Sequence, residues 1–220
     1  PDPTLEAAVD GWFGTLVSVS EELPRLDRTL ELLVLTHPDL DHVGGLPEVL
    51  RRYRVERVLL TGVPKDTARF KEFLSLVRRE GATVFAADPG VDIDLGDGLV
   101  LDIAWPGTGW TGKDVNNSSI VIRALHGGRS ALLTGDIEAK TEDAILRSGA
   151  PLDADILKVA HHGSRTSSGT GFLLAVSPAQ AVISVAKQNR YGHPHPWVLD
   201  RLRRMGIPVR STADEGTVDV

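Results

Sequence analysis

The stretch Thr36-His37-Pro38-Asp39-Leu40-Asp41-His42-Val43-Gly44-Gly45 decides how the rest of this chain is interpreted. Directly after an apolar run it places four metal-capable side chains within six positions: His37, Asp39, Asp41 and His42. Charges crowded at a strand end repel one another and resist desolvation, whereas a divalent cation reverses that balance. The alternative, an Asp-rich turn that caps the next helix, needs one carboxylate and no histidine. The stretch therefore predicts a metal site.

The ligand atoms of this stretch limit the metals that fit. Neutral imidazoles and hard carboxylates suit zinc, manganese or iron. The chain contains no cysteine, so thiolate ligands and disulfides are both excluded.

Length and composition predict one globular domain over residues 1–220. The chain is 41% hydrophobic and 25% charged, which is ample for a buried core. Its formal charge of −6 argues against a broad basic surface for nucleic acid, although bound metals would add positive charge. No apolar run approaches the ~20 residues that cross a bilayer, and no signal peptide opens the chain. We therefore expect a soluble segment without membrane insertion, and its two ends suggest a piece cut from a larger protein.

Strand and helix patterns alternate along the chain with short connections. The expected strands are residues 31–36, 55–60, 83–86, 119–125, 130–134, 155–160, 181–185 and 208–210, with a hairpin at 92–100. The expected helices are residues 46–53, 65–80, 137–147, 171–176 and 196–205. One long polar loop covers residues 108–117. This order predicts an α/β fold.

Each polar cluster follows the C-terminal end of an expected strand. The clusters are residues 37–42, Asp136, residues 161–164 and residues 189–193. Strand ends that share one rim of a sheet converge on a common site. The order therefore predicts one site built from distant segments.

Five motifs occur in a fixed order along the chain. They are Thr-His-Pro-Asp-Leu-Asp-His at 36–42, Asn-Asn-Ser-Ser-Ile-Val at 116–121, Leu-Leu-Thr-Gly-Asp at 132–136, Leu-Lys-Val-Ala-His-His-Gly-Ser at 157–164 and Asn-Arg-Tyr-Gly-His-Pro at 189–194. One such motif is moderate evidence, whereas five in order are specific. From about residue 30 to about residue 216 the chain resembles the metallo-β-lactamase superfamily. Within it, the chain resembles the soluble domain of the ComEC branch of bacterial DNA-uptake proteins.

The resemblance implies an αβ/βα sandwich that holds two divalent metal ions. His37 and Asp39 would bind the first ion, Asp41 and His42 the second, and Asp136 would bridge them. His161 is the expected remaining ligand of the second ion, a role that His162 could exchange with it.

The chain departs from the superfamily pattern at two ligand positions and at its start. Asp39 and Asn116 stand where histidines are usual, which weakens the case for Zn²⁺ and favours Mn²⁺ or Mg²⁺. Mn²⁺ is the expected ion, with Zn²⁺ and Mg²⁺ as alternatives. The ComEC branch usually opens with two further strands, carrying Asp-Val-Gly-Gln-Gly-Asp-Ala and Asp-Gly-Gly. Neither sequence precedes Trp12, so the usual first strands are expected to be missing.

The same motifs supply candidates for catalysis and substrate binding. The catalytic candidates are Asp41, His162, His193 and Lys158, and the substrate-binding candidates are Ser164, Asn116 and Asn189. His193 would bind phosphate or protonate a leaving oxygen. Purely structural roles remain as alternatives for three of the residues named so far. Asp136 could cap the helix at 137–147, Asn116 could close an Asx-turn, and Lys158 could extend its stem along apolar surface.

The resemblance implies a metal-dependent phosphodiesterase, a deoxyribonuclease that degrades DNA during uptake in natural transformation. Single-stranded DNA suits the acidic net charge better than duplex DNA. The implied partner is the membrane channel domain of the parent protein, on the extracytoplasmic face of the cell membrane.

Two other functions remain as alternatives. One is a metallohydrolase of another phosphoester, such as a phosphocholine ester held in an aromatic cage. The other is a non-catalytic domain that docks on the channel.

Overall fold

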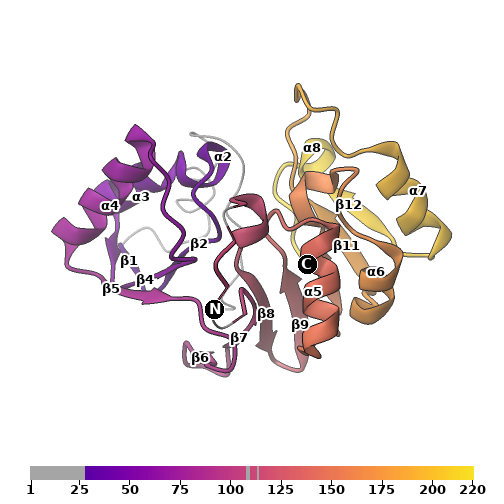
Figure 1. The fold of residues 1–220 in the computed structure, drawn as a ribbon, viewed down its shortest axis with the longest axis horizontal. Coiled ribbons are helices and arrows are strands. Elements are labelled where there is room, and N and C mark those ends of the chain that lie inside the picture. Colours follow the sequence, from indigo (N-terminus) through magenta and orange to yellow (C-terminus); the bar gives the residue numbers. More distant parts are fainter. Residues whose placement is uncertain (1–27, 108–109, 113) are drawn as a thin grey trace. The chain divides into compact units, whose positions relative to one another are not determined.

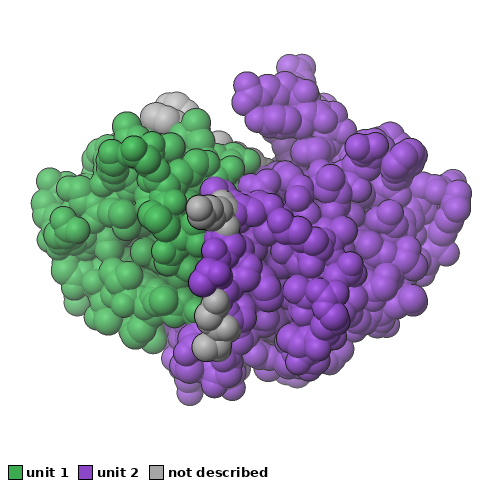
Figure 2. All heavy atoms as spheres, in the orientation of Figure 1, with its two compact units in different colours: residues 1–87 green, residues 88–220 purple. Residues whose placement is uncertain are grey.

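The computed structural model describes residues 28–107, 110–112 and 114–220 of the chain. Its contacts divide the chain into two compact units, residues 1–87 and residues 88–220 (Figure 2). Each unit has its own sheet and its own apolar core. The expectation of one domain stays a prediction.

The first unit is built on a short parallel sheet (Figure 1). Its strand order is β2 (Leu33–Leu35), β4 (Arg57–Leu60) and β5 (Thr83–Ala86), and a separate parallel pair joins β1 (Thr29–Leu30) to β3 (Arg54–Val55). The helices are α2 (Leu40–Val43), α3 (Leu46–Arg52) and α4 (Ala68–Glu80). Helices α3 and α4 bury apolar side chains, which form the core of this unit with those of β2 and β4.

Helix α4 shows how local sequence sets its limits. Thr67 accepts a hydrogen bond from the Phe70 backbone N–H, which starts the helix three residues later than its apolar pattern predicts. Phe70, Phe73 and Val77 lie on one buried face. Gly81 ends the helix in the left-handed conformation, as expected.

The second unit contains a seven-stranded mixed sheet in the order β12-β11-β10-β9-β8-β7-β6. Its strands are β6 (Ile93–Asp94), β7 (Val100–Trp105), β8 (Val121–His126), β9 (Arg129–Leu133), β10 (Ile156–Lys158), β11 (Gln180–Ile183) and β12 (Val209–Ser211). The α-helices are α5 (Ala139–Ser148), α6 (Thr170–Val176), α7 (Pro196–Arg204) and α8 (Thr212–Glu215). Two 3₁₀ helices, η1 (Asn116–Ser118) and η2 (Ala160–Gly163), lie in loops.

The connections explain the change of strand direction in this sheet. Strands β6 to β9 are antiparallel, and the tight Gly127-Gly128 turn joins β8 to β9. Strands β9 to β12 are parallel because a helix lies in each connection between them, which returns the chain to the same end of the sheet.

The α/β order predicted from the sequence is confirmed, with most strands shorter than expected. Part of the polar loop at 108–117 and the segment before residue 28 lie outside the described residues, so the expectation of missing first strands stays untested. Among the helices of the described ranges, none is both long enough and apolar enough to cross a membrane.

Candidate functional site

In the first unit, strand β2 leads directly into a pair of packed histidines. The imidazole of His37 is fully buried, and its ring centroid lies 4.0 Å from that of His42. The Thr36 hydroxyl lies 3.1 Å from Nδ1 of His37 and 3.4 Å from Nδ1 of His42. Because both contacts use Nδ1, Nε2 is the atom of each ring that suits a metal.

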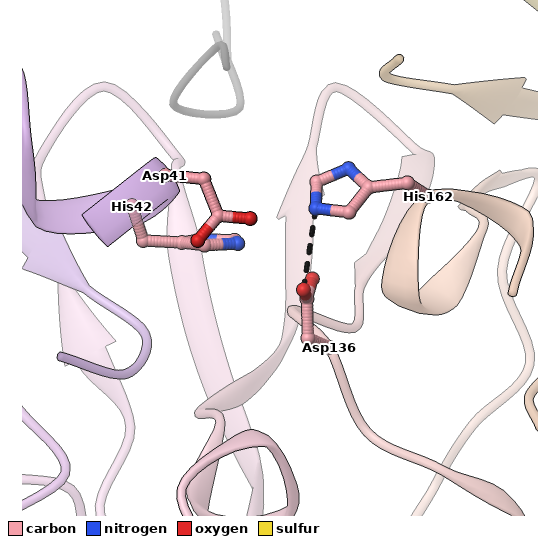
Figure 3. Close-up of side chains that lie close together, drawn as sticks. All are labelled: Asp41, His42, Asp136 and His162. Carbon is pink, nitrogen blue, oxygen red and sulfur yellow. Dashed lines mark ion pairs between the residues drawn. The ribbon is translucent and has the colours of Figure 1, made fainter. Parts of the chain in front are cut away.

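The two aspartates of the motif have different surroundings. Asp39 occupies the N-cap position of α2 without a side-chain capping bond, so the alternative of a capping turn fails for it. Its carboxylate instead pairs with the ammonium of Lys65, from the segment before α4. Asp41 lies exposed in the first turn of α2 beside His42 (Figure 3).

In the second unit, strand register places Asp136 beside the histidine turn. Leu133 at the end of β9 pairs with Lys158 at the end of β10, so both following loops leave the sheet at one edge. The Asp136 backbone N–H donates to Oγ of Ser119 at 2.9 Å, and its side chain is buried. The N-cap position of α5 belongs to Glu138, so the capping role considered for Asp136 is wrong.

His162 is held between a carbonyl and this carboxylate. Its Nδ1 lies 2.8 Å from the carbonyl oxygen of Ser184, which can only accept, so Nδ1 carries the proton. Its Nε2 lies 3.2 Å from Oδ2 of Asp136 (Figure 3). The carbonyl contact therefore sets both the tautomer and the direction of the metal-capable nitrogen.

His161 points to different partners. Its Nε2 lies 3.4 Å from Nδ2 of Asn116, and its Nδ1 lies 3.6 Å from the carboxylate of Glu138. Both adjacent histidines have left-handed backbone conformations, with φ of 50° for His161 and 53° for His162. Such conformations cost of order 1–3 kcal/mol each and persist where surrounding structure fixes them. In this unit the geometry favours His162 over His161 as the partner of Asp136.

Lys158 is buried and lies close to Asp136. Its ammonium donates to the carbonyl oxygen of Gly135 at 3.0 Å and lies 3.7 Å from Oδ1 of Asp136. The alternative of a stem stretched toward solvent is wrong, because the ammonium itself is held inside the unit. Its position balances the charge of the carboxylate.

Asn189 and Ser164, two of the predicted substrate-binding residues, form hydrogen bonds within the loops that carry them. The Asn189 amide donates to the carbonyl oxygens of Ala186 and His193, and its oxygen accepts from the His193 N–H at 2.9 Å. The Ser164 hydroxyl lies 3.0 Å from that of Thr166.

The loop that Asn189 closes carries His193, whose ring centroid lies 5.8 Å from that of His161. Burial is the largest cause that lowers the pKa of His193 below its ordinary value of 6.5. His193 is thus neutral near pH 7.

Several residues that shape this site were not among the candidates predicted from the sequence. Thr36 contacts both histidines of the first unit, Ser184 orients His162, and Glu138 lies beside His161. Asn117 is fully buried and joins Asp114, Glu138 and Thr141 through side-chain contacts. The position of Glu138, two residues after Asp136, was the one available signal.

The donor atoms fit divalent metal chemistry. Each unit contributes imidazole and carboxylate groups, the mixture that borderline and hard cations bind. Within the second unit, the 3.2 Å between His162 Nε2 and Asp136 Oδ2 is close to the roughly 3.3 Å expected for neighbouring ligands around a tetrahedral ion with bonds of ~2.0–2.1 Å. The residues present are therefore compatible with a bound metal.

Comparison with known proteins adds a family and relatives. The model of the family described as "Metallo-beta-lactamase superfamily" matches residues 14–187. The ComE operon protein 3 of Bacillus subtilis is 35% identical over 87% of this chain and 24% of its own length. The competence protein ComA of Neisseria gonorrhoeae is 33% identical over 87% of this chain and 25% of its own length. The chain thus spans about a quarter of the curated relatives it matches.

A solved structure supports the fold alone. The metallo-β-lactamase fold protein YhfI of Bacillus subtilis aligns with a TM-score of 0.57 at 15% identity. The alignment covers 92% of this chain and 82% of that one.

Proposed function

The chain belongs to the metallo-β-lactamase superfamily, and from this premise we propose that it is a metal-dependent phosphodiesterase that cleaves DNA during DNA uptake. The superfamily supports a metal-dependent hydrolase, and the competence-related names of relatives support a role in competence, from which we infer the DNA substrate. The single observation that carries the chemistry is the Asp136–His162 pair, with its tautomer set by Ser184.

We assign the metal ligands from both motif clusters. They are His37, Asp39, Asp41, His42, Asp136 and His162, with His162 in the role first given to His161. The assignment of both clusters to one centre rests on the motifs and the family. Two divalent ions, with Mn²⁺ favoured by the oxygen-rich donor set, would supply a Lewis acid and an activated water when bound.

The other side chains act on the substrate or on the ligands. Asp41 would orient the attacking water as well as bind metal, and neutral His193 would contact the phosphate or a leaving oxygen. Lys158 would hold the Asp136 loop in place, because its ammonium is already bound to Gly135. Asn116 would orient His161 at the edge of the phosphate site.

The phosphocholine-ester alternative needs an aromatic cage. Trp105 and Trp110 do meet edge to face at 6.2 Å. However, the Trp105 indole donates to the Asn117 carbonyl at 2.9 Å, which makes it part of the packing of its own loop. We therefore keep the nuclease as the proposal.

The test is cleavage of labelled single- and double-stranded DNA by metal-stripped protein resupplied with Mn²⁺, Mg²⁺ or Zn²⁺. We expect one ion to restore cleavage, and Asp136→Asn and His162→Ala to lower it by more than about a hundredfold, because each removes a ligand rather than a supporting partner. His126→Ala, a substitution at the end of β8, is the matched control and should cleave like the unaltered protein. Folded protein that binds metal but cleaves no DNA with any ion would contradict the nuclease.

A further inference from the structure

Two exposed aromatic rings lie in the segment that follows the histidine turn of the second unit. Tyr191 is 65% exposed and Trp197 is 62% exposed, which is unusual for rings of this size. Neither ring belongs to the apolar core of the unit. Their exposure calls for an explanation other than packing.

Each exposed ring has an arginine over it. The guanidinium carbon of Arg190 lies 4.9 Å from the Tyr191 ring centroid, and that of Arg165 lies 5.6 Å from the Trp197 ring. Arg190 also donates to the Tyr191 hydroxyl at 2.7 Å. Each guanidinium covers part of its ring, and the ring surface that stays exposed is available to a base while the guanidinium is available to a phosphate.

Both rings connect to the turn that carries His162. Tyr191 stacks on His193 with ring centroids 5.8 Å apart, and His193 in turn lies 5.8 Å from His161. Trp197 contacts His195, whose backbone N–H donates to the Gly163 carbonyl at 2.8 Å. Tyr191 and Trp197 thus lie at the two ends of residues 191–197, a segment that a hydrogen bond joins to the histidine turn at Gly163.

The local charge is opposite to that of the whole chain. Residues 187–204 carry five lysine or arginine residues and one aspartate, whereas the chain carries a net charge of −6. A polyanion would therefore be attracted to this segment in particular. The aliphatic side chains of the same residues are Val198, Leu199 and Leu202, and Val198 and Leu202 are buried, so little here would enter the acyl region of a membrane.

Hydrogen bonds also hold the backbone that carries the two rings. The Asn189 side chain closes the loop that carries Tyr191, which projects from the body of the unit between β11 and α7 (Figure 1). His195 caps the first turn of α7 by accepting from the Trp197 N–H at 3.2 Å. Rings held in place before binding lose less conformational entropy when a ligand arrives.

We propose that Tyr191 and Trp197 form a stacking platform for the bases of single-stranded DNA, with Arg190 and Arg165 positioned to meet its phosphates. The platform deepens the proposed function and rests on it, because it states how the substrate strand is held beside the histidine turn. Stacking tolerates any base sequence, since every base has a flat face.

The test is the affinity of the full chain for a fluorescein-labelled 12-nucleotide single strand, measured by anisotropy in EDTA so that no cleavage occurs. We expect Tyr191→Ala and Trp197→Ala each to weaken binding by about 5- to 150-fold, the range found for loss of one base stack. Tyr191→Phe and Trp197→Phe, which keep a ring, should bind within about threefold of the unaltered protein. Leu174→Ala, at an equally exposed side chain on α6, is the control and should bind unchanged.

A second arm separates stacking from charge. An oligonucleotide with abasic sites should bind the unaltered protein more weakly, and the two alanine substitutions should then have little further effect. Equal binding of the alanine variants and the unaltered protein to the intact strand would overturn the platform. The two alanine variants should also be tested against anionic lipid vesicles. If they lose binding to the vesicles but bind DNA as the unaltered protein does, the two rings form a membrane contact and the proposed platform is overturned. These binding measurements need no metal. The platform can therefore be supported or overturned whether or not the nuclease assay shows cleavage.

Discussion

The Nε2 atom of His162 faces Oδ2 of Asp136 at 3.2 Å, while the opposite nitrogen of the same ring is held by the Ser184 carbonyl. The contact at Nδ1 therefore fixes the orientation of the ring, and Nε2, the metal-capable atom, is directed at the buried carboxylate of Asp136. A histidine supported in this way is typical of metal ligands, where a second contact fixes the tautomer.

The first prediction concerns which of the two adjacent histidines binds metal. In ¹⁵N spectra of metal-free protein, neutral His162 should carry its proton on Nδ1, because the Ser184 carbonyl accepts it. Addition of Zn²⁺ should shift the Nε2 resonance of His162 and leave both nitrogens of His161 nearly unchanged. The opposite pattern would return the ligand role to His161.

The second prediction concerns Asp39, which pairs with Lys65. If Asp39 is a metal ligand, Asp39→Asn should weaken metal binding measured by calorimetry by at least about tenfold. Lys65→Met, which removes the ion pair alone, should leave that affinity equal or higher, because it frees the carboxylate. Since both side chains are partly exposed, the pair itself should contribute less than about 1 kcal/mol to the free energy of unfolding. Equal losses of metal affinity in the two variants would assign Asp39 to the ion pair instead.

The α/β order and the chemical classes of the site residues were predictable, because apolar periodicity and motif spacing are local properties of the sequence. The partners of those residues were not. Ser184 acts through a backbone carbonyl, which carries no side-chain signal, and it meets His162 only because β10 and β11 are parallel neighbours. Nothing in the sequence around Lys158 indicates a buried ammonium. Its hydrogen bond to the Gly135 carbonyl follows from the pairing of β9 with β10.

The third prediction concerns the close approach at Gly163. This residue has φ of +79°, and a Cβ built on it would lie 2.7 Å from Cβ of Pro194. Gly163→Ala should therefore lower the free energy of unfolding by about 2–4 kcal/mol, from backbone strain and the clash together. Gly149→Ala is the matched control, because φ is +74° there but nothing lies within 4 Å of the added atom. Urea unfolding should show a smaller loss of about 1 kcal/mol for Gly149→Ala, and equal losses would contradict a steric role for Pro194.

The last prediction concerns pH and Glu142, a buried carboxyl on α5. Burial raises its pKa above the ordinary value of 4.5, although the backbone N–H groups of Gly169 and Ser168 and the charge of Arg201 act in the opposite direction. The folded protein thus holds this proton to higher pH than the unfolded chain does. The protonated Glu142 carboxyl contributes its full stability at pH values below the pKa of this group in the unfolded chain. That contribution is lost as the pH rises through the pKa of the same group in the folded protein. Urea unfolding between pH 4 and pH 7 should show this decline in the unaltered protein, and Glu142→Gln should make the dependence less steep. A slope that the substitution leaves unchanged would show that other groups govern stability in this range.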